Sequence, residues 1–203
     1  MPWTPLDETA IANMAIDVLD DQPIASLSVD KPVARFMNRN FWPVQSEILY
    51  TYPWYFARKY VSLPATDDPP FGWTYAYQLP ADCVRPLPLR YNGAHDAETI
   101  PYEIVGDKIY TNAPAPLKFI YIKRVTNPAL FTPPFARVFA MTLALYAAQN
   151  ITGKAAYVDK VAALLRTAWD EAKLSDSLTS GTPETQSRSA IVDIRGVGLP
   201  PAT

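Results

Sequence analysis

Apolar positions follow a helical period in two stretches near the N-terminus. In residues 7–19 they recur at three- and four-residue steps, behind acidic residues that suit a helix N-terminus. Residues 30–49 carry one broad apolar face, and the side chain of Asp30 can cap the helix that this face predicts. Pro43 lies inside the second stretch, where it either kinks the helix or begins a new segment.

The period changes after these helices. Pro53 is placed so that residues 54–58 can restart as a short helix, and the proline-rich residues 61–73 are a loop by composition. The apolar period then falls to two, because Tyr75 and Tyr77 alternate with smaller or polar residues. This alternation predicts a half-buried strand with both tyrosines on one face.

Further strands follow in the same region. A turn at residues 79–82 leads to residues 85–91, which two prolines confine to an edge strand or an extended loop. The strand patterns 102–105 and 108–111 flank a Gly-Asp pair, which is a two-residue hairpin signal. Residues 117–125 supply one more strand, so a small β-domain interrupts the helices.

Helical patterns return in the C-terminal part of the chain. Thr132 can cap a helix that Pro133 starts and that runs to about Asn150. This helix is apolar nearly all round, so we expect it to be central or at an interface. Residues 154–178 are amphipathic and predict the last core helix.

The order of these elements predicts an α+β fold. We expect a helical bundle of about four main helices with an inserted small antiparallel β-domain and an extended C-terminal arm. The N-terminal helices of the bundle fall in residues 1–60 and the inserted β-rich domain in 61–130. The C-terminal helices complete the bundle in 131–178, and the arm takes 179–203.

Composition and charge narrow the function classes. The chain is 49% hydrophobic and only 19% charged, which leaves apolar surface for partners. Its net charge of −2 argues against an electrostatic grip on nucleic acid. The nearest approach to a basic cluster is Lys118, Lys123 and Arg124, which we interpret as the flanking charges of a strand.

Targeting signals are not recognisable in the sequence. The N-terminus lacks the basic start and apolar stretch of a signal peptide, and no run approaches the roughly 20 apolar residues of a membrane helix. A single cysteine cannot form an intramolecular disulfide. We therefore expect a soluble protein that is made in the cytoplasm and has no membrane partner.

Candidate chemistry is sparse. Cysteine catalysis needs a nearby histidine, and Cys83 and His95 are the only such pair; a core cysteine is the favoured interpretation. One residue of each type cannot supply the ligands of a zinc site. The sequence also lacks a glycine-rich phosphate loop and a dinucleotide fingerprint. We expect no catalytic residue, no metal site and no cofactor.

Paired carboxylates leave one enzymatic alternative open. A glycoside hydrolase needs two acids at a suitable separation, and the predicted β-domain contains Asp82, Glu98, Glu103 and Asp107. Solvated loop acids are the simpler interpretation, because a chain with 20 acidic residues offers such pairs by accident.

Four sequence blocks together carry a resemblance to a known family. In chain order they are ANMAIDVLDDQPIASL, ARFMNRNFWPVQSEILYTYPWYFA, FGWTYAYQLPADCVRPL and YEIVGDKIYTNAPAPLKFIYIKRVTNPALFTPPF. The chain resembles the head-to-tail adaptor (connector) family of tailed bacteriophages, which includes tail tubular protein A and the adaptor of gene transfer agents. The resemblance covers roughly residues 7–178.

This resemblance implies a structural protein of the virion without enzymatic activity. It implies a dodecameric ring of the protein itself between the portal protein and a tail or nozzle protein, with genomic DNA passing through the channel without sequence-specific binding. The family's fold, a helical bundle with a β-rich insertion, agrees with the pattern of the elements. The family carries no catalytic residues to transfer to this chain.

The tail of the chain is a candidate portal-binding arm. The first residues of this tail have the composition of a mobile linker. The residues beyond the linker are too apolar for a tail that is only solvated, and they can bind a partner as an extended strand. The candidate contact residues are Ile191, Val192, Ile194, Arg195, Val197 and Leu199.

Two other function classes remain open at this point. One is a cell-wall glycoside hydrolase of a phage particle that uses two of the β-domain acids. The other is a helical module that binds nucleic acid. A turbidity assay on cell walls and a salt-dependent DNA titration would separate them from the adaptor.

Overall fold

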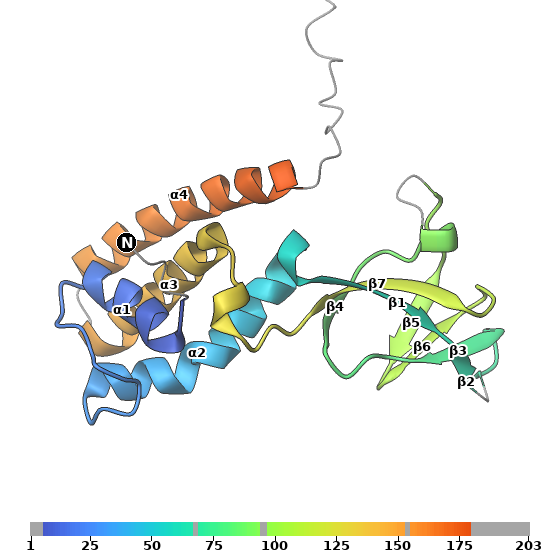
Figure 1. Ribbon diagram of the computed structural model, residues 1–203, viewed down its shortest axis with the longest axis horizontal. Coiled ribbons are helices and arrows are strands. Elements are labelled where there is room, and N and C mark those ends of the chain that lie inside the picture. Colours follow the sequence, from blue (N-terminus) through green and yellow to red (C-terminus); the bar gives the residue numbers. More distant parts are fainter. Residues whose placement is uncertain (1–5, 67–68, 94–96, 153–154, 180–203) are drawn as a thin grey trace, which may run out of the picture.

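The protein has a helical part and a β-sheet part that lie side by side along its long axis (Figure 1). A computed structural model describes residues 6–66, 69–93, 97–152 and 155–179. These residues form four α-helices and two small antiparallel sheets, which confirms the predicted α+β fold class with four main helices. The predicted C-terminal arm lies outside the described residues.

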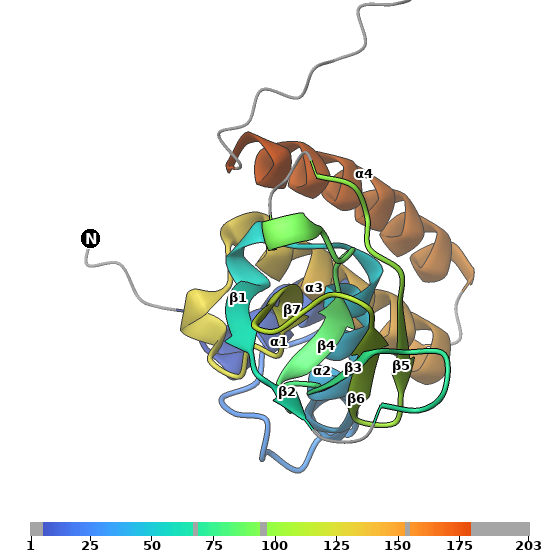
Figure 2. The same ribbon diagram turned by 90° about the vertical axis from the view of Figure 1, so that its right-hand side faces the viewer.

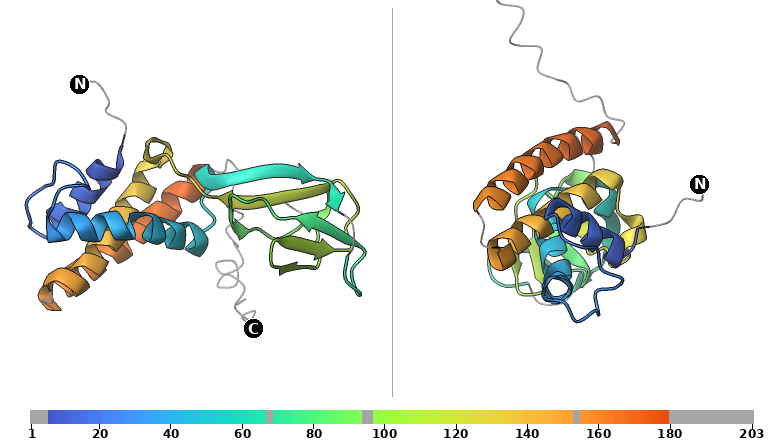
Figure 3. Two further views of the ribbon diagram at one scale, coloured as in Figure 1. Left: turned by 90° about the horizontal axis from the view of Figure 1, so that it is seen from below. Right: turned by 90° about the vertical axis from the view of Figure 1, so that its left-hand side faces the viewer.

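Helix α3 is the centre of the helical part. The helices are α1 (Glu8–Val18), α2 (Pro32–Thr51), α3 (Pro133–Ala147) and α4 (Ala155–Thr179). Helix α3 contacts each of the other three, and it is apolar on most of its surface because it is covered on most sides (Figure 3). The expectation that this helix is central is therefore confirmed.

The helix N-termini agree with the sequence only in part. The carboxylate of Asp7 accepts a hydrogen bond from the Ala10 amide at 2.6 Å, which caps α1 as acidic residues do. The prediction that Asp30 caps α2 is wrong: Lys31 occupies the cap position and Asp30 forms an ion pair with Arg35. Thr132 occupies the cap position of α3, but its side chain makes no capping hydrogen bond.

Pro43 does not begin a new segment. Helix α2 continues through it to Thr51, with the ring on the exposed side of the helix. At the end of α3 the chain adds a wider π-type turn, Ala148–Thr152, so the α-helix itself ends three residues before the predicted Asn150.

The chain enters the sheet earlier than predicted. Instead of a short helix over residues 54–58, a single 3₁₀ turn, Tyr55–Ala57, leads into strand β1 (Arg58–Leu63), and β2 (Ala65–Thr66) follows. The predicted loop over 61–73 is therefore wrong in its first part. The prolines that suggested a loop lie between or after the strands, while β1 pairs with six residues of a partner strand.

The remaining strands complete two sheets (Figure 2). The first sheet has the order β1-β7-β4 and the second β2-β3-β6-β5, all antiparallel. Their bounds are β3 (Tyr75–Gln78), β4 (Cys83–Pro86), β5 (Tyr102–Val105), β6 (Lys108–Thr111) and β7 (Leu117–Lys123).

Turn chemistry explains several of these strands. The hairpin between β5 and β6 is confirmed, and its first turn residue, Gly106, has a φ of +63°, which glycine adopts without a steric penalty. Strand β4 lies at the edge of its sheet, as predicted, because proline cannot donate to a ladder, but it spans Cys83–Pro86 rather than residues 85–91. The predicted last strand ends at Lys123 rather than at residue 125.

Two separate apolar cores stabilise the two parts. The larger core joins all four helices and contains a connected group of aromatic rings, among them Phe41, Trp54, Phe135 and Phe139. The smaller core lies between the sheets and includes Tyr77, Ile109, Phe119 and Tyr121. Tyr75 packs against the smaller core beside Tyr77, so the predicted shared face is confirmed.

Candidate functional site

The predicted arm residues fall outside the described part of the chain. Ile191, Val192, Ile194, Arg195, Val197 and Leu199 all lie beyond Thr179, where α4 ends. The assignment of these residues therefore stays a prediction. The described residues offer two other features that bear on function: a groove between helices and a set of polar contacts where the helical part joins the sheets.

The groove lies between α2, α3 and α4. It has a volume of about 670 Å³ and an apolar floor that includes Ile48, Tyr52, Leu145, Leu165 and Trp169. The ring of Trp169 stands edge-on to Tyr52, with ring centroids 6.5 Å apart, and both rings are only partly covered. The central aromatic core therefore reaches the surface at this point.

Charged side chains of both signs form the rim of the groove. Arg166, Asp170 and Lys173 project from α4, and Glu47 projects from α2. Glu47 accepts a hydrogen bond from the Tyr146 hydroxyl at 2.9 Å, and Lys173 lies 5.4 Å from the Trp169 ring centre. Among the described residues, Arg166 and Asp170 have no hydrogen-bond or ion-pair partner. The rim therefore keeps one free base and one free acid, one helical turn apart.

A buried carboxylate attaches the end of α4 to the start of the sheets. Asp176 is almost fully buried, and both of its oxygens accept from the Tyr55 amide at 3.2 Å, at the beginning of the 3₁₀ turn. Burial raises the pKa of Asp176, while the Tyr55 hydrogen bond and the charge of Arg58 act in the opposite direction. Arg58 itself lies over the Tyr55 ring, 3.6 Å from its centre.

An arginine of the sheet makes a second polar contact with the helical part at this junction. Arg85 of β4 donates from one guanidinium nitrogen to the carbonyls of Tyr50 and Thr51, both at 3.0 Å. These carbonyls belong to the last turn of α2, where the helix leaves acceptors unpaired and favours a positive charge. The contact fixes the end of α2 relative to the sheet.

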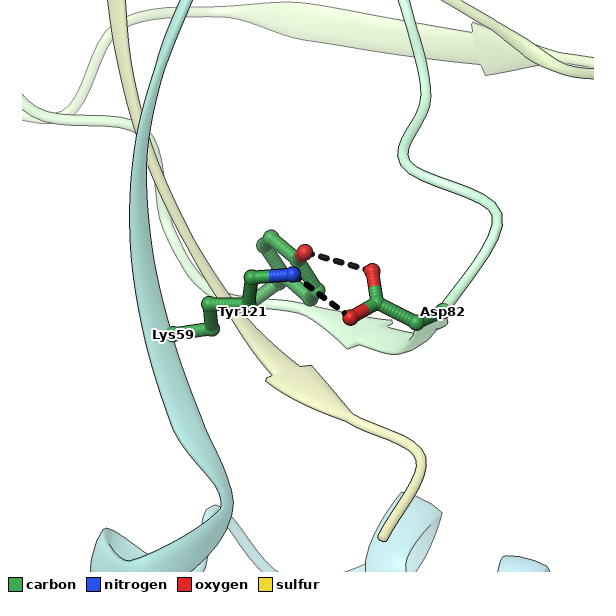
Figure 4. Close-up of polar contacts among 3 residues, drawn as sticks. All are labelled: Lys59, Asp82 and Tyr121. Atoms are coloured by element: carbon green, nitrogen blue, oxygen red, sulfur yellow. Dashed lines mark hydrogen bonds and ion pairs between the residues drawn. The ribbon is translucent and has the colours of Figure 1, made fainter. Parts of the chain in front are cut away.

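Three polar side chains tie together the strands next to the junction (Figure 4). The carboxylate of Asp82 accepts from the Lys59 ammonium at 2.8 Å and from the Tyr121 hydroxyl at 2.6 Å. Lys59 comes from β1, Tyr121 from β7, and Asp82 from the turn between β3 and β4. A backbone hydrogen bond also holds the turn, because the Arg124 amide after β7 donates to the Asp82 carbonyl at 2.7 Å.

The electrostatics of this cluster favour a structural role for Asp82. Burial acts to raise the pKa of Asp82, but the hydrogen bonds from Lys59 and Tyr121 outweigh it and the pKa is lowered. The hydrogen bond to Asp82 raises the pKa of Lys59. An acid that donates a proton to a glycosidic oxygen needs a raised pKa instead.

The other candidate acids of the β-domain have separate contacts or are exposed in the described residues. Glu103 accepts from the Trp73 indole at 3.1 Å, Asp107 accepts from the Gln78 amide at 3.1 Å, and Glu98 is exposed. Cys83 is half-buried, and burial raises the pKa of its thiol to about 11. His95, the only histidine of the chain, lies outside the described residues.

One buried amide is incompletely paired. Gln45 of α2 is fully buried and donates to the Val125 carbonyl at 2.7 Å, but its side-chain oxygen has no partner among the described residues. It borders a second hollow of about 440 Å³ beside Trp42 and Arg124. The oxygen can accept a hydrogen bond from water or from a ligand donor there.

Sequence reasoning did not single out Arg85 and Asp176 at the junction, or the buried Gln45 of α2. Each acts on a partner far away in the chain, so no local spacing marks it. The stripe of α4 that contains Leu165 and Trp169 was recognised, but as core; the structure places part of it at the surface.

Two comparisons with known proteins found no relative. No family model matches the chain, and no curated protein matches it. In the part of the chain that the structure describes, no helix is long and apolar enough to cross a membrane. Within the same residues, no group of three or more His, Cys, Asp or Glu side chains is arranged to hold a metal ion.

Proposed function

We propose that the protein is a head-to-tail adaptor of a tailed bacteriophage particle. In this role it forms a ring of copies of itself between the portal protein and a tail or nozzle protein, and genomic DNA passes through the ring without sequence-specific binding. The role belongs to the virion structure and requires no catalytic residue, cofactor or metal.

The observation that carries the proposal is the position of the family-like motifs in the fold. The Pro53-Trp54 step is where α2 gives way to the sheets, and Trp54 is fully buried there. The block Tyr77–Cys83 contains the β3–β4 turn with Asp82, and residues 112–117 connect β6 to β7. The first two motifs lie at or beside the junction between the two parts, whereas residues 112–117 lie at the opposite end of the sheet, where Leu117 pairs with Leu63. Motifs that coincide with the connections between elements support a shared architecture.

Exposed apolar side chains supply surface for ring contacts. A closed ring needs two different faces on each subunit, because each copy contacts its neighbours head to tail. Leu164, Leu174 and Leu178 are exposed on α4, and Tyr60 and Phe71 are exposed in the sheet part. These two groups lie on different parts of the molecule, as two complementary faces require.

The charge of the chain suits a DNA conduit. A net charge of −2 offers little attraction to phosphates, so DNA can move past the ring without the counterion release that holds it on a basic surface. No observation in the described residues favours the nucleic-acid-binding alternative. The lowered pKa of Asp82 counts against this residue as the proton-donating acid of the hydrolase alternative.

Mass photometry of the protein mixed with purified portal rings tests the proposal. Twelve copies of a 22.6 kDa chain add about 270 kDa to each portal ring in one cooperative step. We expect this shift with portal and not with an unrelated ring protein of similar size. Portal rings whose mass stays unchanged at saturating protein would contradict the proposal.

The arm has its own test within this role. Truncation after Leu178 should leave the isolated protein folded, because both apolar cores consist of residues before that point. The truncated chain should bind portal more weakly than the full chain. If it binds portal as tightly, residues 191–199 are not the portal-binding arm.

A further inference from the structure

The groove between α2, α3 and α4 is open in the described residues although its floor is apolar. Trp169, Tyr52 and Leu165 are all partly exposed there, while the neighbouring aromatic rings are fully buried. Burial of such surface away from water is favourable. The charges of Arg166 and Asp170 at the rim are also without partners among the described residues.

We propose that residues 191–199 of the same chain occupy this groove in the free protein. The sequence of this segment is IVDIRGVGL, and it begins twelve residues after Thr179, the last described residue of α4. The occupant is thus a named segment of the chain itself. The proposal concerns the isolated protein and does not require the adaptor role.

The connecting chain has a suitable length. The lining residues on α4 extend from Leu165 to Lys173, which places them about 9–21 Å from Thr179 along the helix axis. Residues 180–190 are rich in Ser, Thr and Gly, and a flexible chain of this length has a root-mean-square span of about 17–20 Å. Effective concentration is greatest when the span of a linker matches the distance between the sites.

The spacing of apolar residues fits an aromatic groove. Ile191, Ile194 and Val197 recur at every third position, and Pro200 continues the series. An extended conformation with three residues per turn places such a series on one side of the chain. Aromatic-lined grooves bind proline-rich segments in this conformation. Here the floor offers Trp169 and Tyr52, and Ile and Val side chains stand at the positions that prolines take in such segments.

The charges of the segment match those of the rim. Asp193 and Arg195 flank Ile194, so the segment carries one acid and one base between its apolar side chains. The free base and the free acid of the rim, Arg166 and Asp170, offer each of them an oppositely charged partner. Exposed pairs of this type contribute little energy but help to fix the register.

This arrangement would regulate the arm if the adaptor role also holds. The apolar segment would be covered in the free protein and released when portal offers a better site. The apparent affinity for portal would then be lower, because portal could bind the segment only during the fraction of time that the segment spends outside the groove. This consequence rests on the proposed function, whereas occupancy of the groove does not.

Paramagnetic broadening in the full-length chain tests the occupancy. A nitroxide is attached at Gly196→Cys in a Cys83→Ser background, and the indole N–H signals of the ¹⁵N-labelled protein are recorded. We expect the Trp169 signal, assigned with Trp169→Phe, to lose most of its intensity. The Trp73 signal, from the β3 side of the sheet part, serves as the internal reference and should keep its intensity.

Two matched variants separate docking from chance approach. Ile194→Asp with Val197→Asp removes the apolar contacts and should restore the Trp169 signal. Thr185→Asp with Ser187→Asp adds the same charge in the linker and should leave the broadening in place. A Trp169 signal that is broadened no more than that of Trp73, or that is unaffected by the Ile194 and Val197 changes, would overturn the proposal.

A mixed sample identifies which chain supplies the segment. ¹⁵N-labelled protein without the nitroxide is mixed with unlabelled protein that carries it. Broadening of Trp169 in this mixture, equal to that in the doubly labelled chain, would assign the groove to a second copy and overturn docking within one chain. An unchanged Trp169 signal in the mixture supports the proposal.

Discussion

The helical part and the sheet part are stabilised in different ways. The helical core joins four helices through a continuous set of aromatic and aliphatic side chains, with Phe135 in contact with Trp54, Phe56 and Phe131. The sheet core is much smaller, and two of its buried rings, Tyr77 and Tyr121, also donate hydrogen bonds through their hydroxyls. Tyr77 donates to the Ala113 carbonyl at 2.6 Å, in addition to the contacts of Asp82.

The difference follows from the amount of apolar surface that each part can bury. A core with few members contributes little hydrophobic free energy, so buried hydroxyls with fixed partners add specificity where packing alone is weak. The two parts should therefore respond differently to the loss of an aromatic ring and to the loss of a single hydroxyl. The predictions below test this contrast.

The largest effect is expected in the helical core. Phe135→Ala removes a fully buried ring that contacts four other aromatic side chains, and should cost about 3–5 kcal/mol of unfolding free energy. Urea titration measures the loss. Phe71→Ala, at a fully exposed site, is the control and should change stability by at most about 0.5 kcal/mol. Equal effects of the two variants would contradict the assigned core.

A hydroxyl deletion should affect the sheet part selectively. Tyr77→Phe leaves the buried Ala113 carbonyl without its donor and should cost about 1–3 kcal/mol. Hydrogen exchange should become faster in β3 and β6, while α3 keeps its protection. Tyr60→Phe, at an exposed hydroxyl, should be neutral. Faster exchange in α3 as well would mean that the two parts unfold as one unit.

The carboxylates of Asp176 and Asp82, one in each part, should have opposite pH dependences. The raised pKa of Asp176 means that its contribution is complete below its ordinary pKa and is lost as the pH rises through the folded value. Asp176→Asn should remove this loss. The unfolding free energy of the variant, relative to that of the natural chain, should therefore increase as the pH rises above about 4. Denaturant midpoints across this range measure it, with Asp170→Asn as the exposed control.

Asp82 has the reverse sign. Its lowered pKa means that its contribution is complete above its ordinary pKa and is lost as the pH falls through the folded value. Asp82→Asn should therefore be less stable than the natural chain at neutral pH, and the difference should shrink in acid. A gap that stays constant with pH would rule out the ion pair with Lys59 as its cause.

The smallest effect is expected at the only cysteine. Cys83 is half-buried and its thiol has no catalytic partner in the described residues, so Cys83→Ser should cost less than about 1 kcal/mol and leave ring assembly intact. With a pKa of about 11, the thiol should react with alkylating reagents roughly a hundredfold more slowly than an ordinary thiol at pH 8. Rapid alkylation of the folded protein would contradict the burial.

Local periodicity was sufficient for most of the fold and insufficient for the site. The four helices and the hairpin at Gly106 could be predicted, because each depends on residues close together in the sequence. The cap of α2 could not, because Asp30 had a competing partner in Arg35. Strand β1 was missed since its pairing with β7 is long-range, and the prolines that follow it dominated the composition.

The junction and the groove illustrate the same limit. Arg85 and Asp176 are unremarkable in the sequence, and only the fold brings them to the end of α2 and to Tyr55. The stripe of α4 predicted burial for Trp169, but a stripe does not show how far the neighbouring helices cover it. Exposed parts of a core therefore appear only in three dimensions.

Electron microscopy of the portal complex tests the central claim most directly. Class averages of portal rings mixed with excess protein should show an added ring on the portal axis, at one end only, with an open channel. The added density should have the rotational symmetry of copies in a closed ring and should be absent without the protein. Portal rings without added axial density, or an added layer that closes the channel, would contradict the adaptor role.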